Sequence, residues 1–231
     1  MSVKTKHLTE MPKNRHVDNM RMTKKTRAEK TFAILDAISP PEITFLKQTD
    51  PFRLLISVIL SAQTTDRQVN EVAVELFATF PDANTLAKAE IETVKSIIRS
   101  TGYFNAKAKH IIATSQALVE RHDGRVPFSM KELTELPGVG RKTASVILGQ
   151  LAHQPAIIVD THFGRVVRRL GLVESKDPVK IEQEVATLLP PEQHYRYSMI
   201  VNLHGRQVCH AKKPLCSICP LAPFCKSYPI Q

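Results

Sequence analysis

Tryptophan is absent from this 231-residue sequence, and aromatic residues together make up only 6% of it. The apolar content instead comes largely from Ala, Leu, Ile and Val, and with abundant Lys and Glu this composition favours helices over a β-sandwich. No apolar run reaches the roughly 18 residues that a membrane-spanning helix needs, and no signal-peptide pattern opens the chain. We therefore expect an all-α, soluble, cytoplasmic protein that does not associate with a membrane.

Acidic residues are too few to balance the basic ones, and the formal net charge is +10. Residues 1–30 hold nine Lys or Arg and three Asp or Glu, which accounts for +6 of that charge. We interpret residues 1–26 as a basic, disordered tail. The charge is compatible with a polyanionic partner such as nucleic acid, but also with a merely basic surface.

Cysteine is missing from the first 208 residues, and the four cysteines then fall within 17 positions: Cys209, Cys216, Cys219 and Cys225. A disulfide framework is typical of small secreted domains, so metal ligation is the better interpretation. Four thiolates can bind either zinc or a cubane iron–sulfur cluster. Structural zinc sites usually contain two close cysteine pairs, and only one such pair is present here. The residues alone leave both metals open.

Apolar periodicity predicts a series of helices separated by Pro, Gly, Asp or Asn. The expected helices are 30–38, 51–60, 66–77, 85–88, 91–100, 106–121, 130–135, 142–151, 162–169, 179–189 and 194–209. Thr65 or Asp66 is expected to cap the third of them. The one strand-like run, Ala156–Val159, is short and has no partner strand, so we expect a buried linker there.

A glycine-containing turn, Leu136–Gly140, lies between two of these helices and is followed by Arg141 and Lys142. Gly138 and Gly140, on either side of Val139, leave the backbone N–H groups uncovered at a helix N-terminus, which suits a phosphate group. An ordinary tight turn is the alternative. The turn offers no groups that read bases, so it would bind a nucleic-acid backbone without regard to sequence.

Lys142 and Asp160 are the candidate catalytic residues. Lys142 could simply contact phosphate, or its amine could act as a nucleophile if an apolar wall and the helix N-terminus disfavour the ammonium form. Asp160 precedes a helix and suits an N-cap, a role that is compatible with catalysis because a capping carboxylate is held rigidly.

The chain resembles the endonuclease III family of the helix-hairpin-helix–Gly/Pro–Asp superfamily of DNA glycosylases. The resemblance rests on Leu54–Gln63, the Leu136–Ala144 hairpin, Val159–His162 and His204–Arg206 running into the cysteines, and it extends from about residue 30 to about 226. It implies two helical domains that flank a DNA-binding cleft. One is a six-helix barrel at residues 44–154 with the helix-hairpin-helix at about 130–152, and the other is an iron–sulfur domain formed by 27–43 and 155–231.

The resemblance also implies the chemistry: base excision repair by a monomeric, bifunctional DNA glycosylase and abasic-site lyase in the bacterial nucleoid. Lys142 would attack C1′ of a damaged pyrimidine nucleotide flipped out of double-stranded DNA, form an imine and cut the abasic site on its 3′ side by β-elimination. Asp160 would stabilise the cationic sugar and assist proton transfer. The cysteine spacing matches the family's [4Fe-4S] ligands, and no nucleotide or organic cofactor is expected.

Several further residues would contact DNA on this interpretation. Gln63 matches a residue that fills the gap left by the flipped base, although it could be an ordinary loop residue. Tyr103 stands where the family commonly has a wedging leucine, which puts the usual opposite-base preference in doubt; it could also be a packed surface aromatic. His162 would line the cleft or simply start a helix. The cluster would hold three cations against phosphates: Arg206, Lys212 and Lys213.

Three other functions compete with this one. An adenine glycosylase would share the cysteine spacing, but Lys142 and the end of the chain soon after Cys225 argue against it. A non-enzymatic DNA-binding protein held together by zinc would bind DNA and release no base. A ferredoxin-like electron carrier would leave the rest of the chain without a role.

Overall fold

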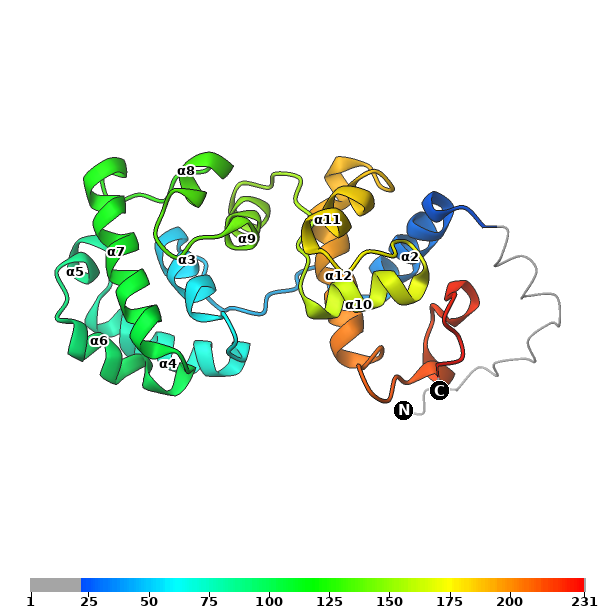
Figure 1. Cartoon of the computed structure of the whole chain (residues 1–231), viewed down its shortest axis with the longest axis horizontal. Helices are drawn as coiled ribbons and strands as arrows, with labels where there is room; N and C mark the ends of the chain where they lie inside the picture. Colours follow the sequence, from blue (N-terminus) through cyan, green and yellow to red (C-terminus); the bar gives the residue numbers. More distant parts are fainter. Residues whose placement is uncertain (1–21, 231) are drawn as a thin grey trace, which may run out of the picture. The chain divides into compact units, whose positions relative to one another are not determined.

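The computed structural model describes residues 22–230, and Figure 1 shows that this part of the chain is built of helices, with no strand among the described residues. The all-helical prediction is confirmed. The chain divides into two compact units. The hairpin unit comprises Pro41–Ile158 and Pro191–Met199, and the cysteine unit comprises the residues up to Pro40, Val159–Pro190 and those from Ile200 onward. The domain boundaries expected from the sequence stay a prediction.

Most helices lie close to their expected positions. In the hairpin unit they are α3 (Pro51–Leu60), α4 (Asp66–Thr79), α5 (Ala83–Ala87), α6 (Ile91–Ile98), η1 (Arg99–Thr101), α7 (Phe104–His122), α8 (Met130–Thr134), α9 (Arg141–Leu151) and η2 (Pro191–Gln193). The cysteine unit contains α2 (Lys24–Ile38), α10 (Thr161–Leu170), α11 (Pro178–Ala186), η3 (Cys216–Ile218) and η4 (Ala222–Phe224). Helix α12 (His194–Gln207) begins in the hairpin unit and ends in the cysteine unit.

The start of α2 corrects one prediction. Thr23 caps this helix by accepting a hydrogen bond from the Thr26 N–H, so the helix begins at Lys24, six residues earlier than expected. The disordered tail predicted for residues 1–26 is therefore wrong for 24–26, and its residues 1–21 lie outside the described part of the chain. The many basic residues suggested a disordered tail, although Thr23 is an ordinary N-cap residue.

Helix α3 is the centre of the hairpin unit. Asp50 caps it, Pro51 occupies its first turn, and eight of its ten residues are buried. Leu54, Leu55 and Ile56 are fully buried in the core, and each such side chain contributes about 1.5–3 kcal/mol through burial. The capped start and the continuous apolar surface explain why the sequence predicted this helix to the residue.

Helix α7 supports the hairpin turn. It packs along α5 and α6, as Figure 1 shows, and also contacts α3. On another part of its surface the Thr114 hydroxyl donates to the Pro137 carbonyl at 2.5 Å. Gly138 has φ +75°, and a Cβ there would lie 2.8 Å from the Cβ of His110. The backbone conformation and the close approach of α7 both require glycine at this position.

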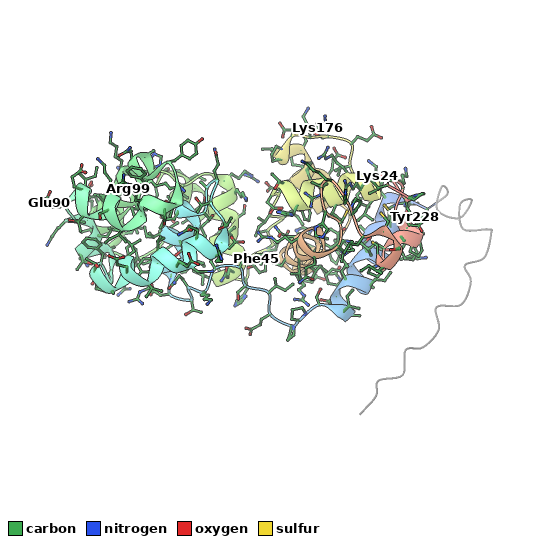
Figure 2. The ribbon with its side chains drawn as sticks, turned by 90° about the horizontal axis from the view of Figure 1, so that it is seen from below. Lys24, Phe45, Glu90, Arg99, Lys176 and Tyr228 are labelled. Carbon is green, nitrogen blue, oxygen red and sulfur yellow. The ribbon has the colours of Figure 1, made fainter. Side chains whose placement is uncertain are left out.

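Charged side chains cover the outside of the units. Glu90 lies at the outer edge of the hairpin unit in Figure 2, and both Glu90 and Arg99 are exposed. In the cysteine unit the ammonium of Lys24 lies 3.7 Å from a carboxylate oxygen of Glu184. None of the helices in residues 22–230 is both long enough and apolar enough to cross a membrane.

Gly149 lies in α9 against the ring of Tyr195, whose burial raises the pKa of its hydroxyl to about 12. A Cβ at position 149 would overlap that ring. We expect Gly149→Ala to lower the free energy of unfolding by about 1–3 kcal/mol despite the better helix propensity of alanine. Urea denaturation measures this change.

Gly140→Ala is the matched control, because a Cβ there meets no atom within 4 Å. It should lower the free energy of unfolding by no more than about 1 kcal/mol, because only the N-cap preference for glycine is lost. Equal stability of the two variants would contradict the packing described here.

Candidate functional site

The hairpin turn leads directly into α9, whose first residues are Arg141 and Lys142. No side chain caps this helix, in contrast to α3, α4 and α8, each of which has a side-chain N-cap. The first N–H groups of a helix lack partners within it and attract anions. Lys142 is exposed in this first turn. The turn therefore combines backbone donors with two exposed cationic side chains.

Val139 does not share this exposure. Its side chain is 5% exposed and belongs to the core of the hairpin unit, and its N–H donates to the Leu136 carbonyl at 3.1 Å. The contact between Val139 and DNA stays a prediction, and within the protein this residue anchors the turn from inside. Gly138 and Gly140, by contrast, are exposed.

Asp160 is the N-cap of α10, and both oxygens of its carboxylate are engaged. Oδ1 accepts a hydrogen bond from the Phe163 N–H at 2.7 Å, and Oδ2 accepts one from the Asn202 side-chain amide at 2.5 Å. Asp160 thus caps α10 and at the same time has its carboxylate held in one orientation. The carboxylate is half-buried, which leaves it accessible to a bound molecule.

Asn202 is a functional candidate that the sequence analysis missed. It is 7% exposed in α12, and its amide oxygen accepts a hydrogen bond from Nε of Arg206 at 2.6 Å. The guanidinium of Arg206 therefore fixes the amide whose N–H group holds Asp160. This engagement gives Arg206 a role beyond the phosphate contact predicted for it. The sequence signal that could have identified Asn202 is that it is the single polar residue in the apolar run Ile200–Leu203.

Lys142 belongs to the hairpin unit and Asp160 to the cysteine unit. That they face one another stays a prediction. His162, the second residue of α10, has its Nδ1 3.2 Å from Nη2 of Arg165. It also packs closely on α12, because a Cβ on Gly205 would lie 3.0 Å from its own Cβ.

All four cysteines are half-buried in the cysteine unit. Burial raises the pKa of Cys219 to about 11, and it also raises the pKa of Cys225. The charges of Cys209 and Cys216 add to both shifts. Iron would favour their thiolate forms, and this donor set fits a four-thiolate cluster. Within residues 22–230, no three His, Cys, Asp or Glu side chains converge on the position of a single ion.

Two arginines on α10 hold the loop that follows Cys209. Arg169 donates from Nη1 to the Cys209 Sγ at 3.2 Å and to the His210 carbonyl at 2.7 Å, and from Nη2 to the Ala211 carbonyl at 2.8 Å. Arg165 donates from Nε to the Cys209 carbonyl at 3.0 Å. The next residues, Lys212 and Lys213, are exposed. Neither arginine was identified from the sequence.

Gln63 and Tyr103 lie in two loops of the hairpin unit, and both are exposed. Both also have left-handed backbone conformations, with φ of 54° and 49°. Such a conformation costs a non-glycine residue roughly 1–3 kcal/mol and persists only where its surroundings enforce it. Gly102, with φ 64° and ψ 157°, adopts a conformation open essentially to glycine alone. Tyr103 is 68% exposed, so the alternative of a packed surface aromatic is wrong.

Comparison with known proteins agrees with these features. Residues 56–191 match the model of the HhH-GPD superfamily of base excision DNA repair proteins, and residues 209–225 match that of the iron–sulfur binding domain of endonuclease III. The chain is 44% identical to endonuclease III of Synechocystis over 89% of its length and 94% of the relative's. It is 40% identical to endonuclease III of Escherichia coli over 81% of this chain and 89% of that protein.

Two solved structures are similar to the whole described architecture. One is a non-covalent endonuclease III–DNA complex, with a TM-score of 0.84, 34% identity, and coverage of 89% of this chain and 96% of that one. The other is a trapped covalent endonuclease III–DNA intermediate, with the same TM-score and identity and with coverage of 89% and 97%.

Mutation can distinguish the contributions of the two hydrogen bonds that the Asp160 carboxylate accepts. Asp160→Ala removes both the cap and the Asn202 contact, and we expect it to lower the free energy of unfolding by about 2 kcal/mol. Asp160→Asn keeps the capping oxygen but turns an amide donor toward the amide donor of Asn202. It should cost about 1 kcal/mol. Urea denaturation at neutral pH measures both, and an alanine variant as stable as the wild type would rule out the arrangement.

Proposed function

The chain belongs to the endonuclease III family of HhH-GPD base excision DNA repair proteins, and we propose that it excises damaged, oxidised pyrimidines from double-stranded DNA. It is a bifunctional DNA glycosylase and lyase, DNA is its partner, and it carries one [4Fe-4S] cluster. Its proposed substrates are damaged-pyrimidine and abasic sites in duplex DNA, on which it acts as a monomer. A DNA substrate and bacterial relatives favour action at the nucleoid.

The observation that carries the proposal is the position of Lys142. It lies exposed in the first turn of an uncapped helix, immediately after a backbone turn suited to phosphate. A DNA strand bound at that turn would have its sugars within reach of a lysine side chain. A lysine amine placed beside a phosphate site favours this arrangement over a hairpin that only binds.

In the proposed reaction the neutral amine of Lys142 attacks C1′ as the bond from C1′ to the base breaks, and the base takes up a proton as it leaves. The sugar ring opens to an imine that links C1′ to Nζ. Loss of a C2′ proton then expels the 3′ phosphate. The carboxylate of Asp160, fixed on both oxygens, would stabilise positive charge on the sugar and help to move these protons.

The remaining DNA contacts are proposed residue by residue. Gly138, Gly140 and Arg141 would bind the strand backbone at the hairpin. Gln63 and Tyr103, which are exposed on two loops, would enter the base stack where the nucleotide leaves. Lys212 and Lys213 would meet phosphates, because the loop that carries them is tied to α10.

Cys209, Cys216, Cys219 and Cys225 are the proposed ligands of the cluster. When bound, the cluster would cross-link the C-terminal segment. The chain's own residues supply the chemistry and the DNA contacts, so the cluster has a structural role in this proposal.

Borohydride reduction tests the role of Lys142, because it converts an enzyme–DNA imine into a stable adduct. With duplex DNA containing thymine glycol, wild-type protein should form the adduct and Lys142→Ala should form none. Lys131→Ala is the matched control, since it removes an equally exposed lysine from the helix on the other side of the hairpin. Adduct formation by Lys142→Ala at the wild-type rate would refute the assignment.

Iron and acid-labile sulfide analysis tests the cysteine assignment. Purified protein should be brown and contain about four of each per chain. Cys216→Ser should reduce both contents, whereas Ser217→Ala, at an exposed position between the ligands, should retain them. Stoichiometric zinc without iron in the wild-type protein would contradict the cluster.

A further inference from the structure

A buried lysine joins two loops of the hairpin unit. Lys107 is 4% exposed, and its ammonium donates to the Thr64 hydroxyl at 2.5 Å and to the Thr101 carbonyl at 2.8 Å. The Thr64 hydroxyl in turn donates to the same Thr101 carbonyl at 2.5 Å. The three polar groups therefore form a closed triangle between the loop after α3 and the loop before α7.

The position is an unfavourable one for a cation. Lys107 lies in the first turn of α7, where the helix dipole opposes positive charge, and burial lowers the pKa of its ammonium. Within the described residues no carboxylate forms an ion pair with it. An apolar side chain would fill the same space without these costs, so packing alone does not account for lysine here.

The triangle fixes the backbone on which two exposed side chains are mounted. Thr64 directly follows Gln63, and Thr101 is two residues before Tyr103. The bond from the Lys107 ammonium to the Thr101 carbonyl adds to the first backbone bond of α7, in which the Lys107 N–H donates to the Tyr103 carbonyl at 3.1 Å. Gln63 and Tyr103 both have left-handed conformations that their surroundings must maintain.

We propose that Lys107 is a positioning residue that sets Gln63 and Tyr103 in one fixed arrangement before DNA binds. The inference rests on the proposed function, in which both side chains enter the stack as the nucleotide leaves. Without the ammonium the two loops would relax independently. The side chains would then no longer be ready to enter together, and extrusion of the nucleotide would slow.

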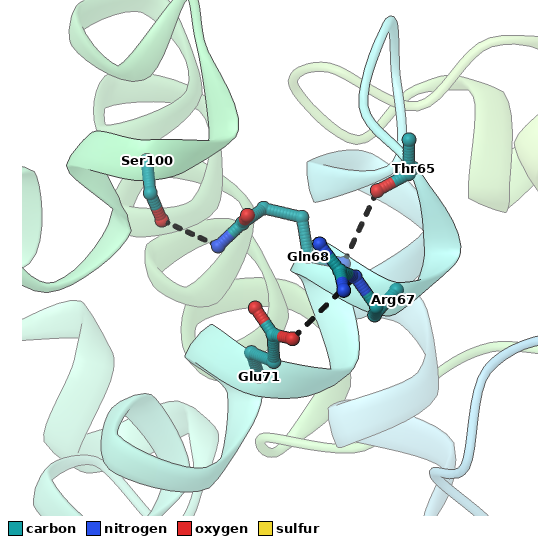
Figure 3. A network of polar contacts seen from close by, with 5 residues as sticks. All are labelled: Thr65, Arg67, Gln68, Glu71 and Ser100. Carbon is teal, nitrogen blue, oxygen red and sulfur yellow. Dashed lines mark hydrogen bonds and ion pairs between the residues drawn. The ribbon is translucent and has the colours of Figure 1, made fainter.

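A second link, between α4 and the residue before Thr101, provides a matched control. Figure 3 shows Gln68 reaching from α4 to Ser100, with its Nε2 2.8 Å from the Ser100 hydroxyl, while Arg67 pairs with Glu71 on the same helix. This link is exposed and competes with water. Its loss should matter little, in contrast to loss of the buried triangle.

The test compares two substrates. Lys107→Met keeps most of the buried stem and removes the ammonium, and we expect single-turnover base release from a thymine glycol duplex to slow about tenfold or more. Borohydride trapping on a preformed abasic site in single-stranded DNA needs no duplex opening. It should stay within about twofold of wild type. Circular dichroism melting reports whether the variant is folded.

Variants of Thr64 test the same proposal independently if Lys107→Met folds poorly. Thr64→Val removes the hydroxyl and should slow duplex cleavage in the same selective way, whereas Thr64→Ser restores the hydroxyl and the rate. Gln68→Ala should remain near wild type on both substrates.

The inference is overturned if Lys107→Met and Thr64→Val act on the duplex at the wild-type rate. It is equally overturned if they lose duplex and single-strand activity in parallel, which is the signature of a general structural defect. Failure of the proposed function is distinguishable, because the wild-type protein would then release no base from the thymine glycol duplex.

Discussion

The cysteine unit depends on the fixed orientation of one side chain, the carboxylate of Asp160. Asp160 begins α10 by capping it, and the amide of Asn202 on α12 holds its second oxygen. The start of one helix is thereby tied to the side of another. The same α10 carries Arg165 and Arg169, which bind the backbone around Cys209. The helix that starts at the proposed catalytic carboxylate therefore also anchors the segment that carries the cysteines.

The hairpin unit uses buried polar contacts in a similar way. Its apolar core, centred on α3, fixes where α7 and α9 lie. Three residues of α7 then shape the loops. Thr114 donates a hydrogen bond to the Pro137 carbonyl, and His110 packs against Gly138. Lys107 joins the loops that contain Thr64 and Thr101. Because backbone polar groups in these loops are bonded to a rigid helix, the exposed side chains beside them are presented in defined positions.

Local sequence signals predicted the helices and the hairpin turn, because these depend on local structure. Apolar periodicity and the Pro51 and Thr65 start signals located α3 and α4, and the glycines of the hairpin predicted a turn. The roles of Asn202 and Lys107 could not be predicted, because each depends on a partner about 40 residues away that only the fold brings near. Val139 shows a different limit: its motif is recognisable, but the motif does not say that its side chain is buried and its N–H bonded within the turn.

The central claim is that the amine of Lys142 forms the covalent link to DNA. Peptide mass spectrometry of the borohydride-reduced complex, after digestion of both protein and DNA, measures directly which residue carries the sugar remnant. The account predicts that the added mass lies on Lys142 alone. An adduct on another lysine of the chain, with Lys142 unmodified, would contradict it.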